Sequence, residues 1–183
     1  LGLIGSRKYV ESLNADELKD IALYLNFDML ASPNAGYLTY DGDQSLPLDQ
    51  RGRPIVPEGS PGIERILVGY LASAGKTAQD TSFDGRSDYD GFTQAGIPSG
   101  GLFSGAEEKM TAQQAELWGG KADEPFDPNY HKAGDTLANI NQESLGIQGA
   151  GVGYAVGYYA MNVAGRNGVA DFDDRTRHEL TTP

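Results

Sequence analysis

One short apolar run constrains the fold of this chain more than any other feature. Residues 21–27 read Ile-Ala-Leu-Tyr-Leu-Asn-Phe and are bounded by polar residues on both sides. A run this short and this apolar is typical of a strand with both faces buried, as in parallel and mixed sheets. Asp28 follows directly. Open α/β sheets bind ligands at the carboxyl ends of their strands, so Asp28 is better placed for function than for the core.

Helix and strand patterns alternate along the rest of the chain. Helical spacing of apolar residues predicts helices over residues 3–13, 63–74, 88–95 and 111–118, and a long helix after residue 141. Short runs predict further strands over residues 36–41, 77–83 and 97–103. The Pro- and Gly-rich residues 41–61 are typical of a surface loop. Alternating strands and helices predict the α/β class.

Charge and cysteine content exclude several function classes. The formal net charge is -12, from 14 basic and 26 acidic residues. Such a surface repels phosphate backbones and anionic lipid, so we expect no nucleic-acid partner and no membrane-surface role. The chain has no cysteine, which excludes disulfides and thiol catalysis. Any metal must therefore be bound by His, Asp or Glu, a ligand set that suits zinc.

The uncharged residues 144–165 raise the question of a membrane helix. Gly149, Gly153 and Gly157 follow one another at four-residue spacing, as in helices that pack together in membranes. Gln148, Asn162 and the abundance of glycine make insertion unfavourable. We therefore predict no membrane-spanning segment, but a buried helix whose glycines allow close approach to a sheet.

Four stretches carry residues suited to catalysis, over residues 25–29 (LNFDM), 85–92 (GRSDYDGF), 95–103 (AGIPSGGLF) and 130–136 (YHKAGDT). Each alone has a plain explanation. Asp28 could cap a turn, a lone His131 could be a surface residue, and Phe103 could belong to the core. Spacing by itself does not establish a metal site.

Together and in this order, the stretches resemble peptidase family M28, and above all the zinc aminopeptidases secreted by Streptomyces and related actinobacteria. The resemblance runs from residue 1 to about residue 145. It includes the segments LGLIGS (1–6), NFDMLASPN (26–34), GGLF (100–103) and WGG (118–120). It implies a three-layer α/β/α fold with a mixed, mostly parallel sheet, of which residues 1–170 are the C-terminal half. Residues 171–183 form a charged tail that we expect to fray.

The resemblance also implies a metal site with two zinc ions held by five residues. Asp28 and His131 match two of these ligands. Tyr130 matches a tyrosine that hydrogen-bonds the oxyanion developing during hydrolysis, a charge that a hydroxyl donor stabilises. Asp135 is a candidate acceptor for the second ring nitrogen of His131.

Three further positions match residues that contact the substrate in the family. Met29 and Phe103 correspond to residues lining the pocket for the first side chain of the peptide. Arg86 corresponds to a residue whose backbone carbonyl helps to hold the free amine. We therefore expect a di-zinc aminopeptidase that acts on peptides with apolar N-terminal residues, secreted or at the cell surface.

The remaining zinc ligands and the glutamate general base of the family precede the segment that matches residues 1–6. We therefore expect this chain to be part of a longer protein. Its partner there is the missing N-terminal half of the same domain. Two alternatives remain. One is an inactive member or fragment that uses the fold to bind a partner. The other, which the motifs favour less, is acyl transfer of the glutaminyl cyclase type.

Overall fold

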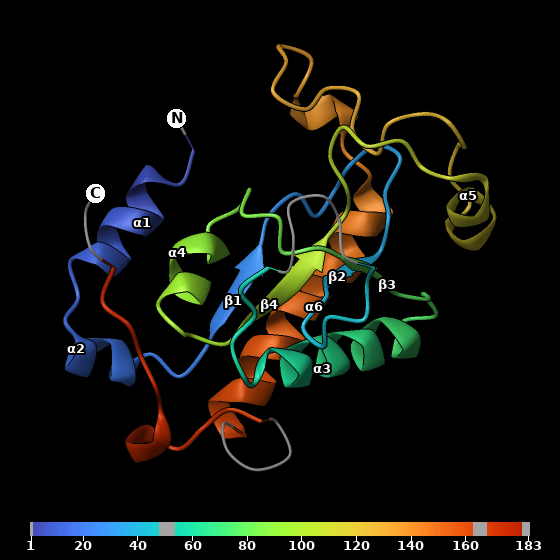
Figure 1. The fold of residues 1–183 in the computed structure, drawn as a ribbon. Helices are drawn as coiled ribbons and strands as arrows, with labels where there is room; N and C mark the ends of the chain where they lie inside the picture. The colour runs from blue at the N-terminus through green and yellow to red at the C-terminus, as the bar shows by residue number, and fades with distance from the viewer. Residues whose placement is uncertain (1, 48–53, 163–167, 181–183) are drawn as a thin grey trace.

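A four-stranded mixed sheet forms the centre of the structure, a computed structural model that describes residues 2–47, 54–162 and 168–180 (Figure 1). Its strands are β1 (Tyr24–Phe27), β2 (Leu38–Tyr40), β3 (Gln79–Thr81) and β4 (Ser99–Phe103), in the order β1-β4-β2-β3. β1 runs parallel to β4 and β2 parallel to β3, whereas β2 and β4 are antiparallel. The sheet is therefore mixed and mostly parallel, as expected.

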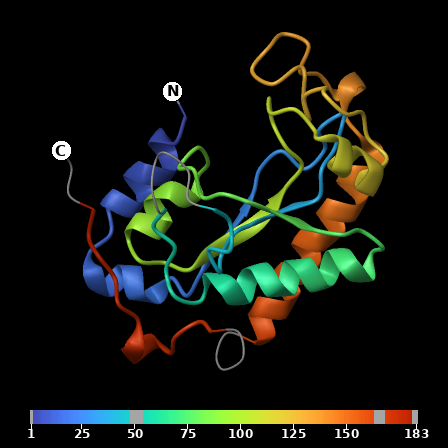
Figure 2. The ribbon, with the colours of Figure 1, turned by 45° about the vertical axis from the view of Figure 1, so that its right-hand side comes forward.

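Two long helices, α3 (Ser60–Ser73) and α6 (Gln142–Met161), cover one face of the sheet (Figure 2). The main core lies between them and the sheet, and it joins Leu67 of α3, Leu102 of β4 and Ala155 of α6. α3 approaches β4 very closely, since a Cβ atom at Gly100 would lie 2.5 Å from Cγ2 of Ile63. The glycine in the β4 sequence thus lets this helix seat on the strand.

The other face carries α4 (Tyr89–Gln94), with α1 (Ile4–Glu11) packed on α4. The ring of Phe92 in α4 stacks on Tyr24 of β1 with centroids 3.9 Å apart, and Val10 of α1 joins the same cluster. α2 (Ala15–Asp20) adds Leu18 to it and starts at a capping box on Asn14. Helices on both faces of the sheet give the expected three-layer α/β/α arrangement.

The glycines of α6 do not act as expected. Gly151 faces the sheet, where a Cβ atom would lie 2.7 Å from Leu102 and 2.8 Å from Tyr70. Gly149, Gly153 and Gly157 have no described atom within 4 Å of such a position. The close approach to the sheet therefore depends on Gly151, and the expectation for the other three is wrong. Among the described residues, no helix is long and apolar enough to cross a membrane.

The C-terminal segment, which contains the short helix η3 (Phe172–Asp174), is anchored over its described part. Arg175 donates to the carbonyl of Lys19 at 2.6 Å, and Arg177 donates to those of Ile21 and Gly96, each at 2.9 Å. The guanidinium groups satisfy carbonyls that the ends of α2 and α4 leave open. The expectation that this tail frays is wrong for residues 171–180, and residues 181–183 lie outside the described part. The domain division at residue 170 stays a prediction.

The other predicted elements agree with the structure apart from their ends, whereas α2 and the short helix η1 were not predicted. The predicted strand over residues 21–27 begins only at Tyr24, because Ile21 terminates α2. α5 (Ala112–Trp118) and η1 (Leu137–Asn139) lie in the long excursion after β4. The loop expected over residues 41–61 gives way to α3 at Ser60, and its residues 48–53 lie outside the described part.

Candidate active site

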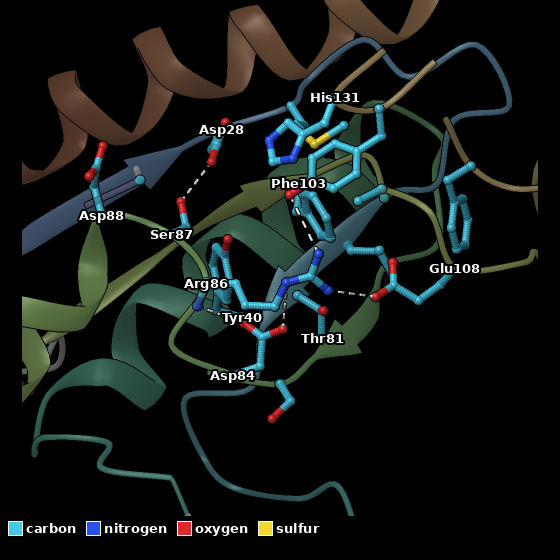
Figure 3. A pocket seen from close by; sticks show the side chains of 18 of the residues that line it. Asp28, Tyr40, Thr81, Asp84, Arg86, Ser87, Asp88, Phe103, Glu108 and His131 are labelled. Atoms are coloured by element: carbon cyan, nitrogen blue, oxygen red, sulfur yellow. Dashed lines mark hydrogen bonds and ion pairs between the residues drawn. The ribbon is translucent and has the colours of Figure 1, made fainter. Parts of the chain in front are cut away.

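A pocket of ≈ 610 Å³ opens beside the carboxyl ends of β1 and β4 (Figure 3). All seven site residues expected from the sequence line it: Asp28, Met29, Arg86, Phe103, Tyr130, His131 and Asp135. They come from four separate loops and strand ends, and the fold brings them to one cavity. Their shared location is a finding of the structure, whereas their chemical roles stay predictions.

The carboxylate of Asp28 is held by a buried polar network on the α4 face of the sheet. Ser87 Oγ donates to Asp28 Oδ2 at 2.8 Å and accepts from Asn26 Nδ2 at 3.0 Å. Asn26 also donates to Tyr40 Oη at 3.3 Å. Burial, and then the charge of Asp28, raise the pKa of Tyr40 above its usual range, so that hydroxyl stays protonated. The network orients Asp28, and its other members were not expected from the sequence.

The sequence does contain signals for two of these network residues, Asn26 and Ser87. Asn26 is the polar residue inside an otherwise apolar strand, and a buried amide of this kind requires hydrogen-bond partners. Ser87 lies beside Arg86 in a stretch singled out for other reasons. That the two side chains meet depends on the position of the loop before α4, which the sequence does not reveal.

Two of the expected site residues have unusual backbone conformations. Met29 has φ 52° and His131 has φ 55°, values that residues other than glycine rarely adopt. The imidazole of His131 stacks on the ring of Tyr130 with centroids 3.8 Å apart. Backbone strain of this kind costs about 1–3 kcal/mol and is concentrated at functional sites. It supports a functional interpretation of both loops.

Arg86 connects three loops at the pocket. Its Nη2 lies 2.7 Å from Glu107 Oε1 and 3.4 Å from Tyr130 Oη, and its Nη1 lies 3.2 Å from Glu108 Oε1. Partial desolvation acts to lower the pKa of this guanidinium, but the hydrogen bonds and the charges of Glu107 and Asp84 outweigh it and raise the pKa. Arg86 is therefore a permanent cation in a largely acidic surrounding.

The pocket has a distinct apolar part. Met29, Leu38, Phe103, Ala106 and Phe126 contribute to its lining. The ring of Phe103 lies parallel to that of Tyr40, with centroids 6.4 Å apart. An apolar wall next to acidic groups suits a ligand with an apolar side chain and a positive charge, such as the N-terminal residue of a peptide.

Asp135 lines the pocket, but its predicted contact is absent. Among the residues that the structure describes, no hydrogen bond joins Asp135 to the His131 side chain; instead its backbone N–H donates to the carbonyl of Lys132 at 3.0 Å. Asp135 is exposed. Its expected role as the acceptor for His131 stays a prediction.

The free donor atoms of the pocket fit a zinc site in part. Among the described contacts, Asp28 uses Oδ2 for Ser87 while Oδ1 accepts no hydrogen bond, and no hydrogen bond involves the ring nitrogens of His131. A carboxylate oxygen and an imidazole nitrogen are ordinary zinc donors. Two ligands do not complete a tetrahedral site, so the described residues can supply only part of a metal centre.

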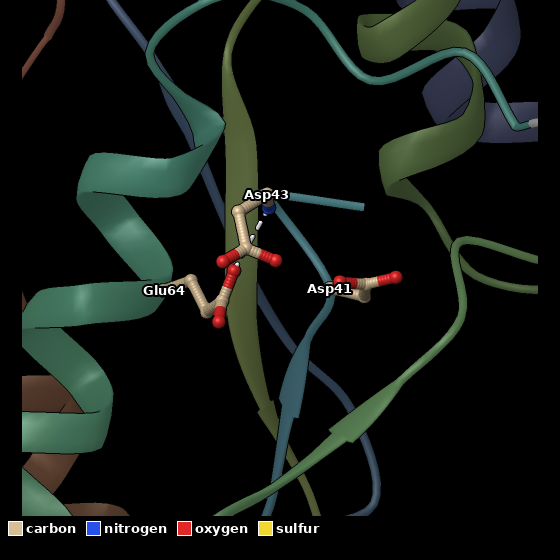
Figure 4. Close-up of side chains that lie close together, drawn as sticks. All are labelled: Asp41, Asp43 and Glu64. Atoms are coloured by element: carbon tan, nitrogen blue, oxygen red, sulfur yellow. Dashed lines mark hydrogen bonds between the residues drawn. The ribbon is translucent and has the colours of Figure 1, made fainter. Parts of the chain in front are cut away.

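A second acidic cluster lies elsewhere, between the end of β2 and α3 (Figure 4). Carboxylate oxygens of Asp41, Asp43 and Glu64 lie within 4.8 Å of one another. Backbone N–H groups already satisfy much of this charge, since Ser45 and Leu46 donate to Asp41, and Asp43 donates to Glu64 at 2.9 Å. Burial raises the pKa of Glu64. These contacts secure the loop after β2 to the start of α3.

Comparisons with known proteins agree with this geometry. The family model described as peptidase family M28 matches residues 1–156. The probable lipoprotein aminopeptidase LpqL of Mycobacterium tuberculosis is 74% identical over 182 residues, which are 100% of this chain and 36% of that protein. The probable leucine aminopeptidase 2 of Aspergillus oryzae is 46% identical over 179 residues, 96% of this chain and 35% of that protein.

A solved structure supports the fold. The crystal structure of BSAP, a zinc aminopeptidase from Bacillus subtilis, matches with a TM-score of 0.59 at 23% identity, over 92% of this chain and 36% of that one. The chain thus spans about a third of the length of the relatives that it matches. With its motifs, its three-layer fold and this family match, the chain belongs to peptidase family M28.

Proposed function

We propose that this chain forms part of a zinc aminopeptidase with two metal ions, which removes N-terminal residues from peptides. The observation that carries the proposal is the meeting of Asp28, His131 and Tyr130 in one pocket with free metal-binding atoms and an apolar wall. The relatives named as aminopeptidases support the reaction class. The remaining ligands and a general base come, in this proposal, from the part of the protein outside this chain.

In this assignment Asp28 and His131 each bind a zinc ion. Ser87 fixes the carboxylate of Asp28 through Oδ2, which leaves Oδ1 as the oxygen for the metal in this proposal. When bound, a zinc pair supplies an activated water and polarises the scissile carbonyl. Tyr130 donates its hydroxyl proton in a hydrogen bond to the oxygen on which negative charge develops, and this stabilises the transition state.

Substrate selection follows from the rest of the lining. Met29 and Phe103 contact an apolar first side chain. The backbone carbonyl of Arg86, with the nearby carboxylates of Asp84 and Asp88, favours a protonated free amine. A peptide bond further along the substrate lacks that charge at the required place, so cleavage is confined to the N-terminus.

We place the protein outside the cell or at its surface, because a relative 74% identical is named as a lipoprotein. Its proposed partners are peptide substrates and the N-terminal half of its own domain. The sheet supports the second partner, because β1 is an edge strand that pairs with β4 alone among the described strands. An unpaired strand edge is ordinarily covered in a stable protein.

The test uses the full-length protein, purified with its metal. Mass spectrometry under native conditions should give two zinc ions per molecule, and leucine p-nitroanilide should be hydrolysed. Chelation with 1,10-phenanthroline should abolish turnover, and added Zn²⁺ should restore it. Turnover that survives complete zinc removal contradicts the proposal. Binding of peptides without hydrolysis identifies an inactive binding protein, and cyclisation of N-terminal Gln peptides identifies acyl transfer.

A further inference from the structure

The side chain of Arg86 has a geometry that its expected role, through the backbone carbonyl alone, does not explain. Its guanidinium reaches across the pocket to Tyr130, which lies in a loop far along the chain. Nη2 of Arg86 is 3.4 Å from Tyr130 Oη, and the guanidinium carbon is 5.9 Å from the centre of the tyrosine ring. Figure 3 shows Arg86 among the pocket side chains, with dashed lines marking its hydrogen bonds and ion pairs.

Carboxylates hold the guanidinium in place from other sides. Glu107 and Glu108 accept from Nη2 and Nη1 at 2.7 and 3.2 Å, and Asp84 Oδ2 lies 3.9 Å from Nε. A guanidinium is planar and rigid, so contacts along several of its edges fix the direction of every remaining donor. The arrangement therefore aims one N–H of Arg86 at the hydroxyl of Tyr130.

The contact has one direction only. Arginine carries donors and no acceptor, so the oxygen of Tyr130 must accept. Among the described residues, Arg86 is the only side chain that hydrogen-bonds this hydroxyl. The proton of the phenol is therefore left free to be donated to another acceptor. A phenol that accepts from a cation also becomes a stronger donor, because hydrogen bonds in series polarise one another.

We propose that Arg86 is a positioning residue for Tyr130: its side chain orients the phenol and strengthens it as the donor to the oxyanion. This inference rests on the proposed function, since it concerns the tyrosine assigned there to the transition state. It adds a function for the guanidinium that is separate from substrate binding through the backbone of the same residue. Glu107 and Glu108 act one step further away, by holding Arg86.

The kinetic test uses full-length protein and five variants. Arg86→Met keeps an unbranched apolar stem and removes the guanidinium donors, and it should lower kcat about tenfold with little change in KM. Arg86→Lys keeps the positive charge but lacks the paired N–H donors of the guanidinium, so its kcat should lie between those of wild type and Arg86→Met. In the double variant Arg86→Met with Tyr130→Phe, the loss should equal that of Tyr130→Phe alone. Lys121→Met removes another exposed cation with a carboxylate partner and is the control.

Two kinetic results overturn the inference in an active enzyme. One is an unchanged kcat in Arg86→Met. The other is a loss in the double variant that equals the product of the single losses, because independent effects multiply. If kcat is unchanged and only KM rises in Arg86→Met, the guanidinium acts in substrate binding and not on Tyr130.

A second measurement separates this inference from the proposed function. Protein labelled with 3-fluorotyrosine gives a ¹⁹F signal for Tyr130, which its loss in Tyr130→Phe identifies. The signal should shift or broaden in Arg86→Met and stay unchanged in Lys121→Met. An unchanged signal in Arg86→Met overturns the inference whether or not the protein is active. An inactive wild-type protein overturns the proposed function, and the ¹⁹F result then decides alone whether Arg86 holds Tyr130.

Discussion

Ser87 donates a hydrogen bond of 2.8 Å to Asp28, and the structure leaves it little choice of acceptor. The hydroxyl has one proton, while Asn26 Nδ2 donates to the same oxygen at 3.0 Å. Asn26 Oδ1 is the competing acceptor, but at 3.4 Å it is the weaker one for this proton. The hydrogen bond therefore fixes which oxygen of Asp28 remains for the proposed metal ion.

Replacing Ser87 by Ala should weaken zinc binding to the full-length protein by about 10–100-fold, the usual effect of losing a side chain that orients a metal ligand. Competition with a zinc-binding dye measures this affinity. Ser73→Ala is the control, because Ser73 is exposed on α3 and donates only to the carbonyl of Tyr70. Equal zinc affinity of the Ser87 variant and wild type counts against this role.

The two histidines of the chain offer a matched pair. His131→Ala should lower kcat/KM by about a thousandfold, since a lost zinc ligand removes several kcal/mol of transition-state stabilisation. His178→Ala, in the C-terminal segment, should leave the rate unchanged. Steady-state hydrolysis of a leucine amide by full-length protein decides the matter. Near-normal turnover of the His131 variant would show that this residue is not a ligand.

Tyr130→Phe removes only the hydroxyl of the proposed oxyanion donor. We expect kcat to fall by about 10²–10³-fold and KM to change little, because the hydrogen bond forms in the transition state. Tyr154→Phe serves as the comparison, since Tyr154 is exposed on α6. If KM rises while kcat holds, Tyr130 binds the ground state and the assignment is wrong.

Two glycines of α6 should respond in opposite ways to alanine. Gly151→Ala places a Cβ atom 2.7 Å from Leu102, and we expect this overpacking to lower the free energy of unfolding by about 1–3 kcal/mol. Gly153→Ala has no described atom within 4 Å and should raise the free energy of unfolding by up to about 1 kcal/mol through helix propensity. Urea denaturation compares the two. Equal effects would mean that α6 does not approach β4 at Gly151.

Asp80 gives a prediction on pH. Burial, and further the charges of Asp41 and Asp43, raise the pKa of its carboxyl, although a hydrogen bond from Ser45 opposes them. The folded pKa then exceeds the unfolded value of about 3.9, so this group favours the folded state at low pH. That contribution is lost as pH rises through the folded pKa.

Replacing Asp80 by Asn should therefore raise the thermal midpoint at pH 7 and change it little at pH 3. Thermal melts across this range measure the difference between variant and wild type. Glu116→Gln, an exposed change on α5, controls for the removal of one negative charge. A variant that is equally stabilised at both pH values contradicts the raised pKa.

Much of the fold was accessible from the sequence because its signals are local. The apolar run before Asp28 predicted β1, and helical spacing predicted both ends of α3 and the start of α6 to within a few residues. The antiparallel pairing of β2 with β4 was not predictable in this way, because pairing depends on contacts between distant segments. The hydrogen bonds of Arg177 were not predictable for the same reason, since they reach carbonyls at the end of α2, which is distant in the sequence.

The site likewise combines residues that local motifs identify with contacts that depend on distant segments. Asp28 and His131 were identified from motifs that resemble those of the family, and the structure brings them to one pocket. The Ser87 hydrogen bond and the reach of Arg86 to Tyr130 depend on loop positions that no local pattern encodes. The same holds for Gly151, since spacing along α6 could not tell which glycine faces the sheet.

The position of β4 in the sheet has a consequence for the nascent chain on the ribosome. β4 is the last strand to be synthesised, yet it lies between β1 and β2 and pairs with both. Until it emerges, no described strand joins β1 to β2, and the apolar side chains that pack on β4 lack that partner. Unpaired apolar strands are prone to aggregation while a chain is incomplete. Translation that stalls before Ser99 should therefore leave a species that depends on chaperones, even if every helix before that point has already formed.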